Sequence, residues 1–142
     1  MVGTTLDIPK KRSTRHRDLI ALLVFAVVAA LFHFNFTMSM VKGRSMEPTL
    51  HDGQIVLVGK QIPFFSSNAL KRGDIIIFHQ DGETLVKRVS LVPGDPLPDG
   101  RTLPQGFFYV LGDNPPMSED SRSFGPIAAT QIVGRLLKAK PL

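Results

Sequence analysis

The sequence contains no cysteine, and it has 142 residues. The missing thiols exclude disulfide bonds, cysteine nucleophiles and zinc or iron–sulfur sites with cysteine ligands. The length leaves room for one modest domain, at about 100 to 200 residues per domain. With 43% hydrophobic and 20% charged residues, the chain is neither disordered nor fibrous.

Histidine is also scarce, with four in the chain. Two of them belong to the N-terminal region, which leaves His51 and His79 for a Ser–His triad or a metal site. Neither stands in a metal-ligand spacing such as H-E-x-x-H, so ordinary surface positions are the simpler interpretation. A metal centre built from Asp113, Asp120 and a histidine is an alternative that the spacing does not favour.

The body of the chain lacks an excess of charge. Residues 1–18 carry five basic and two acidic side chains, a net charge of +3, whereas residues 19–142 carry 12 basic and 10 acidic ones. A nucleic-acid-binding protein of this size usually has a basic stripe on its folded part, and we expect no nucleic-acid partner. A basic cluster beside an apolar run is instead typical of a membrane anchor.

The apolar run predicts one transmembrane helix. Leu19–Phe32 is fourteen residues without a polar side chain, and residues 19–41 carry no formal charge. At 1.5 Å per residue this segment can cross the bilayer's hydrocarbon core of about 30 Å. The positive-inside rule predicts a cytoplasmic tail over residues 1–18, an anchor over 19–41 and an extracytoplasmic domain over 42–142.

A cleaved secretory signal is the alternative to this anchor. Val28 and Ala30 fit a small-x-small cleavage pattern after a basic region. However, the uncharged stretch continues well past Ala30, further than a signal sequence needs. An uncleaved signal-anchor is therefore favoured.

The rest of the chain predicts an all-β domain. Turn dipeptides such as Asp52-Gly53 and Asp81-Gly82 separate short runs rich in β-forming residues, and no helical periodicity is convincing. The predicted strands cover residues 54–58, 74–79, 84–92 and 106–111. Residues 78–85 should form a hairpin, and the proline-rich segment 93–104 a loop.

Lys87 is an unusual residue in the third of these strands. Alternation places its side chain on the face of Leu85, Val89 and Leu91. Burial lowers the pKa of a lysine, and a neutral lysine can accept the proton of a serine hydroxyl. The alternatives are that Lys87 reaches the sheet edge or pairs with a carboxylate.

Ser45 is a possible partner for Lys87. It lies on a loop between the anchor and the first strand, between flexible Gly43 and rigid Pro48. Backbone N–H groups of such a turn can bind an oxyanion. Taken alone this signal is weak, because most loop serines make only local hydrogen bonds.

Four segments together resemble the type I signal peptidase family, in the family's order and after an N-terminal anchor. They are Gly43-x-Ser45-Met46-x-Pro48-Thr49-Leu50, Arg72-Gly73-Asp74-Ile75-Ile76-Ile77-Phe78, Lys87-Arg88-Val89 leading to Val92-Pro93-Gly94-Asp95, and Gly112-Asp113-Asn114 followed by Ser118-x-Asp120-Ser121-Arg122-x-Phe124-Gly125-Pro126. The resemblance covers residues 19–135. It implies a mostly antiparallel, coiled β-sheet body and a Ser/Lys dyad that needs no histidine, metal or other cofactor.

The resemblance also implies a role for individual residues. Ser45 matches the nucleophile, Lys87 the general base, and Ser118 the serine whose hydroxyl orients the lysine amine. The supporting polar framework would comprise Asp113, Asp120 and Arg122. The shallow pockets for small substrate side chains would be lined by Val41, Met46 and Val86.

Three features depart from the family pattern. Gly43 stands where some members have a serine that donates to the oxyanion, which leaves the Ser45 backbone N–H as the surer donor. Residues 95–104 form a short connection where larger members insert a second β-domain. The segment Pro115-Pro116-Met117 replaces charged and amide residues. This compactness is similar to the peptidases that mature conjugative pilins.

The sequence therefore predicts a membrane-anchored serine endopeptidase. Its partners would be the lipid bilayer and preproteins whose signal peptides have small residues at the cleavage site, and Ser45 would lie within roughly 14 Å of the end of the anchor. A specialised peptidase for one pilin or one secreted substrate is the closest alternative. A catalytically silent assembly subunit and a self-cleaving repressor are alternatives of other classes, although the latter are soluble proteins with a DNA-binding module.

Overall fold

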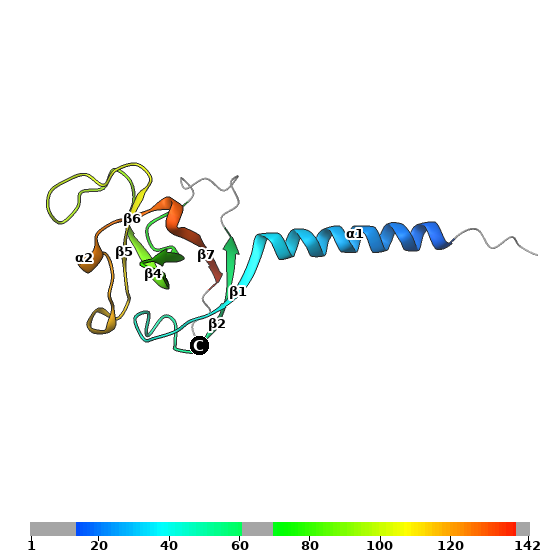
Figure 1. The fold of residues 1–142 in the computed structure, drawn as a ribbon, viewed down its shortest axis with the longest axis horizontal. Coiled ribbons are helices and arrows are strands. Elements are labelled where there is room, and N and C mark those ends of the chain that lie inside the picture. The colour runs from blue at the N-terminus through cyan, green and yellow to red at the C-terminus, as the bar shows by residue number, and fades with distance from the viewer. Residues whose placement is uncertain (1–13, 61–69, 139–142) are drawn as a thin grey trace, which may run out of the picture. The chain divides into compact units, whose positions relative to one another are not determined.

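The N-terminal part of the chain forms one long apolar helix. The computed structural model describes residues 14–60 and 70–138, and in it helix α1 runs over Thr14–Asn35 (Figure 1). The window His16–Asn35 has a mean hydropathy of 2.1, and none of it is buried. Its length of about 30 Å matches the hydrocarbon core of a bilayer. The predicted apolar helix is confirmed, although it begins before Leu19 and ends at Asn35 rather than at Val41.

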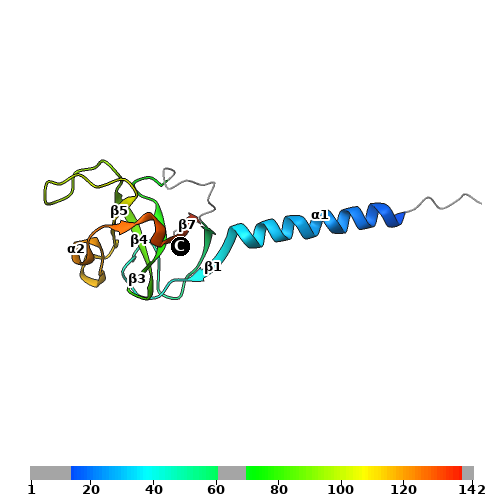
Figure 2. The same cartoon turned by 45° about the horizontal axis from the view of Figure 1, so that its top comes forward.

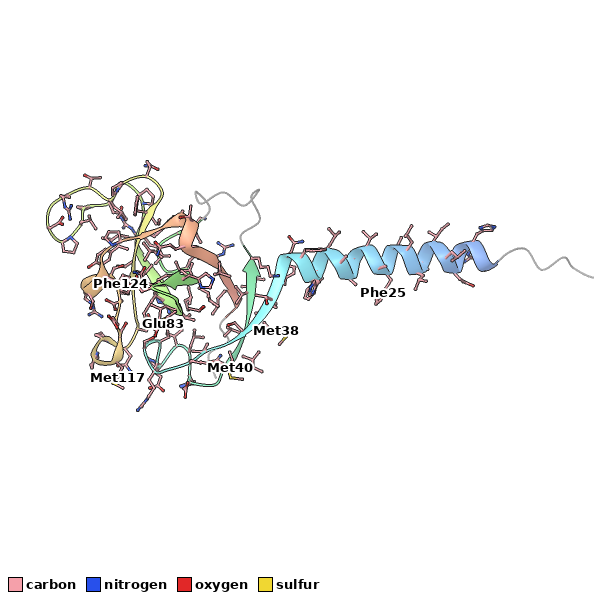
Figure 3. The ribbon with its side chains drawn as sticks, viewed as in Figure 1. Phe25, Met38, Met40, Glu83, Met117 and Phe124 are labelled. Atoms are coloured by element: carbon pink, nitrogen blue, oxygen red, sulfur yellow. The ribbon has the colours of Figure 1, made fainter. Side chains whose placement is uncertain are left out.

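The end of the predicted span is a β-strand instead of helix. Strand β1, Phe36–Met40, pairs antiparallel with β2, Ile55–Lys60. Its sequence alternates apolar and hydroxyl side chains, which suits a strand of period two. Met38 and Met40 are on its exposed side (Figure 3). Hydropathy alone could not separate this strand from the helix, because its residues are uncharged as well.

A seven-stranded antiparallel sheet forms the body that follows α1. The strands after β1 and β2 are β3 (Ile75–Gln80), β4 (Glu83–Leu91), β5 (Phe107–Leu111), β6 (Ile127–Ala128) and β7 (Ile132–Lys138). Their spatial order is β1-β2-β7-β3-β4-β5-β6. Single turns interrupt the body, namely the 3₁₀ helices η2 (Pro115–Met117) and η3 (Ala129–Gln131) and the helix α2 (Ser121–Phe124). The predicted antiparallel β-sheet body is confirmed.

The predicted hairpin of β3 and β4 is present. Gln80 faces Glu83 across the two-residue turn Asp81-Gly82, and both turn residues have positive φ, 49° and 84°. Such angles define the turn that matches the twist of antiparallel strands, and aspartate and glycine tolerate them. The turn fixes which residues of β4 face which side, and therefore where Lys87 points.

Two hydrophobic clusters hold the sheet, and β3 contributes to both. Ile75 and Ile77 belong to the first cluster, and Ile76 and Phe78 to the second. Burial on both faces explains the continuous apolar run of this strand. Helix α2 packs against β5 (Figure 2), and its Phe124 ring lies 6.3 Å from that of Phe78. The core thus joins β3 to the segment that follows β5.

Candidate active site

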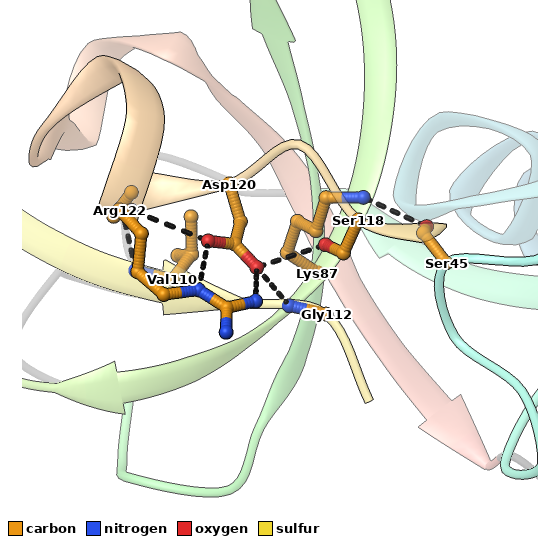
Figure 4. A network of polar contacts seen from close by, with 8 residues as sticks. Ser45, Lys87, Val110, Gly112, Ser118, Asp120 and Arg122 are labelled. Atoms are coloured by element: carbon orange, nitrogen blue, oxygen red, sulfur yellow. Dashed lines mark hydrogen bonds and ion pairs between the residues drawn. The ribbon is translucent and has the colours of Figure 1, made fainter. Parts of the chain in front are cut away.

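Ser45 and Lys87 meet, although 42 positions separate them in the sequence. Lys87 Nζ lies 2.7 Å from Ser45 Oγ (Figure 4). Ser45 is on the turn between β1 and β2, and this turn is fixed by the buried side chains of Met46 and Leu50. A strand and a buried turn thus hold the amine and the hydroxyl at hydrogen-bonding distance.

The surroundings of Lys87 favour the neutral amine. Its side chain is 3% exposed, and its strand neighbours Leu85 and Val89 both pack in the second cluster. Burial lowers the pKa of Lys87, while the negative charges of Asp120 and Glu119 act in the opposite direction. Within residues 14–60 and 70–138, Lys87 forms no ion pair with a carboxylate. The strand has therefore brought the ammonium out of water without giving it a counter-ion in contact.

Asp120 is the centre of a hydrogen-bond network next to this pair. Its side chain is fully buried, and it accepts hydrogen bonds from the Arg122 guanidinium at 2.6 and 2.9 Å and from the Gly112 backbone N–H at 2.9 Å. Burial raises the pKa of Asp120, but the hydrogen bonds outweigh this effect and hold the pKa well below its usual range. Asp120 therefore stays a carboxylate.

Ser118 belongs to the same network. Its hydroxyl donates to Asp120 Oδ2 at 2.8 Å (Figure 4). Once that proton is committed, the lone pairs of the hydroxyl oxygen remain as acceptors. Ser118 is consequently oriented by Asp120, and its role toward Lys87, which the sequence predicted, stays a prediction.

A second ion pair holds Asp113, and its partner was not among the predicted residues. Arg88 donates to both carboxylate oxygens of Asp113, at 2.6 and 2.8 Å, and also to the Gly73 carbonyl at 2.8 Å. Burial acts to raise the pKa of Asp113, and the hydrogen bonds from Arg88 and Thr49 lower it overall. Arg88 follows Lys87 on β4, so the ion pair of Arg88 and Asp113 fixes the strand next to Lys87. The adjacency in Lys87-Arg88 was the available sequence signal.

The segment after β5 also binds the Ser45 turn directly. Asn114 donates its backbone N–H to the Ser45 carbonyl and its side-chain amide to the Arg44 carbonyl, both at 2.9 Å. At Gly112 a Cβ atom would come within 2.1 Å of Ser118 Oγ and 2.7 Å of the Ser45 carbonyl oxygen. Only glycine allows this close approach. Neither contact was predicted, because a sequence does not show which loops touch.

The three predicted pocket residues lie in one place. Val41 and Met46 are buried in the first cluster, and Val86 is half-buried against that cluster. Val86 precedes Lys87 on β4 and Met46 follows Ser45 on the turn, so two of the three residues are next to the pair in the sequence. Their role in binding substrate stays a prediction.

The carboxylates of the site are engaged by arginines. Asp113 is bound to Arg88 and Asp120 to Arg122. In the described part of the chain, no group of three histidine, cysteine or acidic side chains is arranged to hold a metal ion. The site therefore combines a hydroxyl, a buried amine and two arginine-bound carboxylates, which together suit nucleophilic attack assisted by an amine base.

Comparison with known proteins points to one family. The family model described as "Signal peptidase, peptidase S26" matches residues 16–98 and 96–138. Signal peptidase I of Bacillus caldolyticus is 32% identical over 168 aligned positions, which cover 89% of this chain and 91% of that protein. Signal peptidase IB of Staphylococcus aureus (strain COL) is 29% identical over 159 positions, covering 80% and 82%. The ranges matched by the family model include all the residues of the site.

Proposed function

The chain belongs to the signal peptidase family, peptidase S26, and on that premise we propose that Ser45 and Lys87 cleave signal peptides as nucleophile and general base. The observation that carries this proposal is the 2.7 Å contact between Lys87 Nζ and Ser45 Oγ in a buried setting. A buried lysine that contacts a serine hydroxyl, and that forms no ion pair with a carboxylate of residues 14–60 and 70–138, has the arrangement that activates a nucleophile.

The proposed reaction has two steps. The neutral Lys87 amine takes the proton of Ser45 as Oγ attacks the carbonyl carbon of the scissile bond. The C–N bond then breaks, Lys87 returns the proton to the leaving amine, and an ester on Ser45 remains. In the second step Lys87 takes a proton from water, the resulting hydroxide attacks the ester, and the signal peptide leaves as a carboxylic acid while Ser45 recovers its proton. The Ser45 backbone N–H is the proposed donor to the oxyanion in both steps.

One edge of β4 is open and supplies a place for the substrate. In the described residues, positions 83–87 pair only with β3, whereas β5 pairs with β4 from Arg88 onward. Val89 exchanges both backbone hydrogen bonds with the β3 side, at Gly73 and Asp74. By the antiparallel alternation, the backbone groups of Thr84 and Val86 point to the open edge. An extended peptide can add to this edge as a strand.

The apolar cluster beside that edge fits the expected cleavage sites. Val41 and Met46 are almost completely buried and Val86 is half-buried, so this cluster offers a substrate side chain only a small apolar surface. Small residues before the scissile bond therefore fit this surface best. This supports preproteins with small-x-small sites as substrates.

Helix α1 supports a membrane location, and we propose an orientation for it. The signal peptidases are membrane proteins, and α1 is long and apolar enough to cross a bilayer. Basic residues concentrate before its apolar part, at Lys10, Lys11, Arg12, Arg15 and Arg17. The positive-inside rule then places the N-terminus in the cytoplasm and the body outside. Protease added to spheroplasts should digest the body, and protection of the body would contradict this orientation.

The catalytic assignment is tested with the full chain in detergent and a preprotein that has a small-x-small site. Mass spectrometry of the products should give one new N-terminus directly after that site. Ser45→Ala should abolish cleavage, and Ser123→Ala, at an exposed serine of α2, should retain it. If Ser45→Ala cleaves at an undiminished rate, Ser45 is not the nucleophile.

The breadth of the substrate range is a separate question. Mature N-termini of secreted proteins can be compared in cells with and without this enzyme. Many unprocessed preproteins would support a general signal peptidase. A single unprocessed pilin would support the specialised alternative.

A further inference from the structure

The sheet determines where a bound substrate must leave it. A peptide on the open edge of β4 would take the position that β5 occupies farther along the same strand, because β5 pairs with β4 only from Arg88 onward. The last residue of β5, Leu111, faces Arg88. The peptide and β5 would therefore meet end to end near Lys87. A substrate strand cannot continue past this point and has to rise out of the sheet.

The segment that follows β5 lies at this exit. Gly112 approaches both Ser118 and the Ser45 carbonyl, and Asn114 is hydrogen-bonded to the Ser45 turn. Residues on one side of the scissile bond can lie along β4 beside the apolar cluster of Val86. Residues on the other side have to pass over segment 112–118. Since the cluster suits the small residues before the scissile bond, the segment would face the residues after it.

The surface of this segment is apolar and exposed. The 3₁₀ helix η2 consists of Pro115, Pro116 and Met117, all solvent-exposed. The Met117 side chain is 57% exposed, and Figure 3 shows it on the loop after β5, in a different part of the body from Met38 on β1. Two prolines restrict the backbone on its N-terminal side. A methionine held in this way offers a flexible apolar contact at little backbone entropy cost.

We propose that Met117 contacts the first residues after the scissile bond and makes the enzyme prefer apolar side chains there. The inference rests on the proposed function, because it uses the polarity of the substrate that the signal peptide assignment implies. It adds a specificity determinant on the mature side of the cleavage site. The cluster of Val41, Met46 and Val86 would select the signal side, and Met117 the mature side.

The test uses the full chain in detergent and peptides that share one small-x-small site. The first and second residues after the site are varied separately among alanine, leucine, aspartate and lysine. At the position that Met117 contacts, the wild type should prefer leucine over aspartate by about tenfold in kcat/KM, the size typical of one apolar contact. Met117→Ala should reduce this ratio to about twofold. An unchanged ratio in Met117→Ala would overturn the proposal.

Charge substitutions separate contact from a disturbed loop. Met117→Glu should favour lysine over aspartate at that position, and Met117→Lys should reverse this preference, both more strongly at low salt. If the substitutions merely disturbed the loop, the lysine-to-aspartate ratio would change in the same direction in both variants. That result would also overturn the proposal. Met38→Gln, at an exposed methionine of β1, is the matched control and should leave all ratios unchanged.

The outcome is distinguishable from failure of the proposed function. If the wild type does not cut the alanine peptide at the small-x-small site, the signal peptide assignment fails. If it cuts there but the charge variants do not shift the lysine-to-aspartate ratio in opposite directions, only the role of Met117 fails.

Discussion

Lys87 and Arg88 are adjacent cations on β4, and their surroundings change their pKa values in opposite directions. Lys87 is buried against Ser45 without an ion pair to a described residue, and burial lowers its pKa. Arg88 is bound by both oxygens of Asp113, and this hydrogen bonding raises its pKa. Strand alternation alone sends the two side chains to opposite faces. A basic side chain becomes a usable base only where its neighbours do not stabilise its proton.

Replacing Lys87 with arginine should have the largest effect on activity. Lys87→Arg keeps a positive charge at the dyad, but a guanidinium stays protonated and cannot act as a base. We expect kcat to fall about 10,000-fold, as for the loss of a residue that acts as a unit with the nucleophile. Initial rates on a preprotein measure this loss, and circular dichroism checks that the fold is retained.

Arg88→Lys is the reciprocal substitution. It keeps the charge opposite Asp113 and loses only the two-point geometry of the guanidinium. We expect kcat to fall by at most about tenfold, because Arg88 does not touch the reacting atoms. A loss as large as that of Lys87→Arg would show that the two cations are not functionally distinct.

Replacing Arg88 with methionine should have the next largest effect. This effect is on the stability of the fold. In Arg88→Met the carboxylate of Asp113 remains partly buried without its partner. We expect unfolding to become easier by about 2 kcal/mol, less than for a fully buried pair because Arg88 is one-third exposed. Urea titration measures the change. Adding Asp113→Asn should recover part of it, and a double variant that is less stable still would contradict the ion-pair explanation.

The sequence predicted Lys87 better than it predicted Arg88. Strand alternation placed Lys87 on an apolar face, the family resemblance supplied its role as a base, and turn dipeptides placed the strands on either side. Arg88 was missed because its importance comes from Asp113, which is 25 residues away, and pairing at that distance depends on how β4 and β5 meet. The family resemblance supplied Asp113 but not its partner.

The strand at residues 36–40 was missed for a related reason. It is uncharged like the helix before it, and its strand conformation depends on pairing with β2. The contacts of Asn114 and Gly112 with the Ser45 turn likewise arise from loop packing. Local patterns predicted strands β2 to β5, and the family resemblance supplied the Ser45/Lys87 dyad, whereas the contacts between loops required the tertiary structure.

Removing the Lys87 amine should stabilise the protein while destroying its activity. A folded-state pKa below the unfolded value means that the native state disfavours the charged form. Lys87→Met avoids this cost and keeps a similar volume, so we expect an increase in stability of about 1 kcal/mol near neutral pH. Thermal unfolding measures it. A decrease as large as that of Arg88→Met would show that Lys87 contributes to the fold as Arg88 does.

The same variant gives a test of pH dependence. Between the lowered pKa of folded Lys87 and the unfolded value of about 10.4, the unfolded chain binds more protons than the native protein. The stability of the wild type should therefore increase as pH rises through this window, because the native protein no longer has to carry the Lys87 proton. Lys87→Met should lack that contribution. If the difference in stability between the wild type and Lys87→Met does not change with pH, this would contradict a lowered pKa of Lys87.

The smallest expected effect concerns a distant charge that opposes the burial of Lys87. Glu119 is exposed, and its negative charge raises the pKa of Lys87 against the effect of burial. Glu119→Gln removes this charge, so the pKa of Lys87 should fall and the neutral base should be present at lower pH. The acid limb of kcat/KM should then move to lower pH by a few tenths of a unit at low salt, and by less at high salt, because an exposed charge is screened. Asp81→Asn, at the exposed turn of the hairpin, is the matched control and should not move the limb. A shift to higher pH in Glu119→Gln, or the same shift in Asp81→Asn, would show that the limb does not report the titration of Lys87.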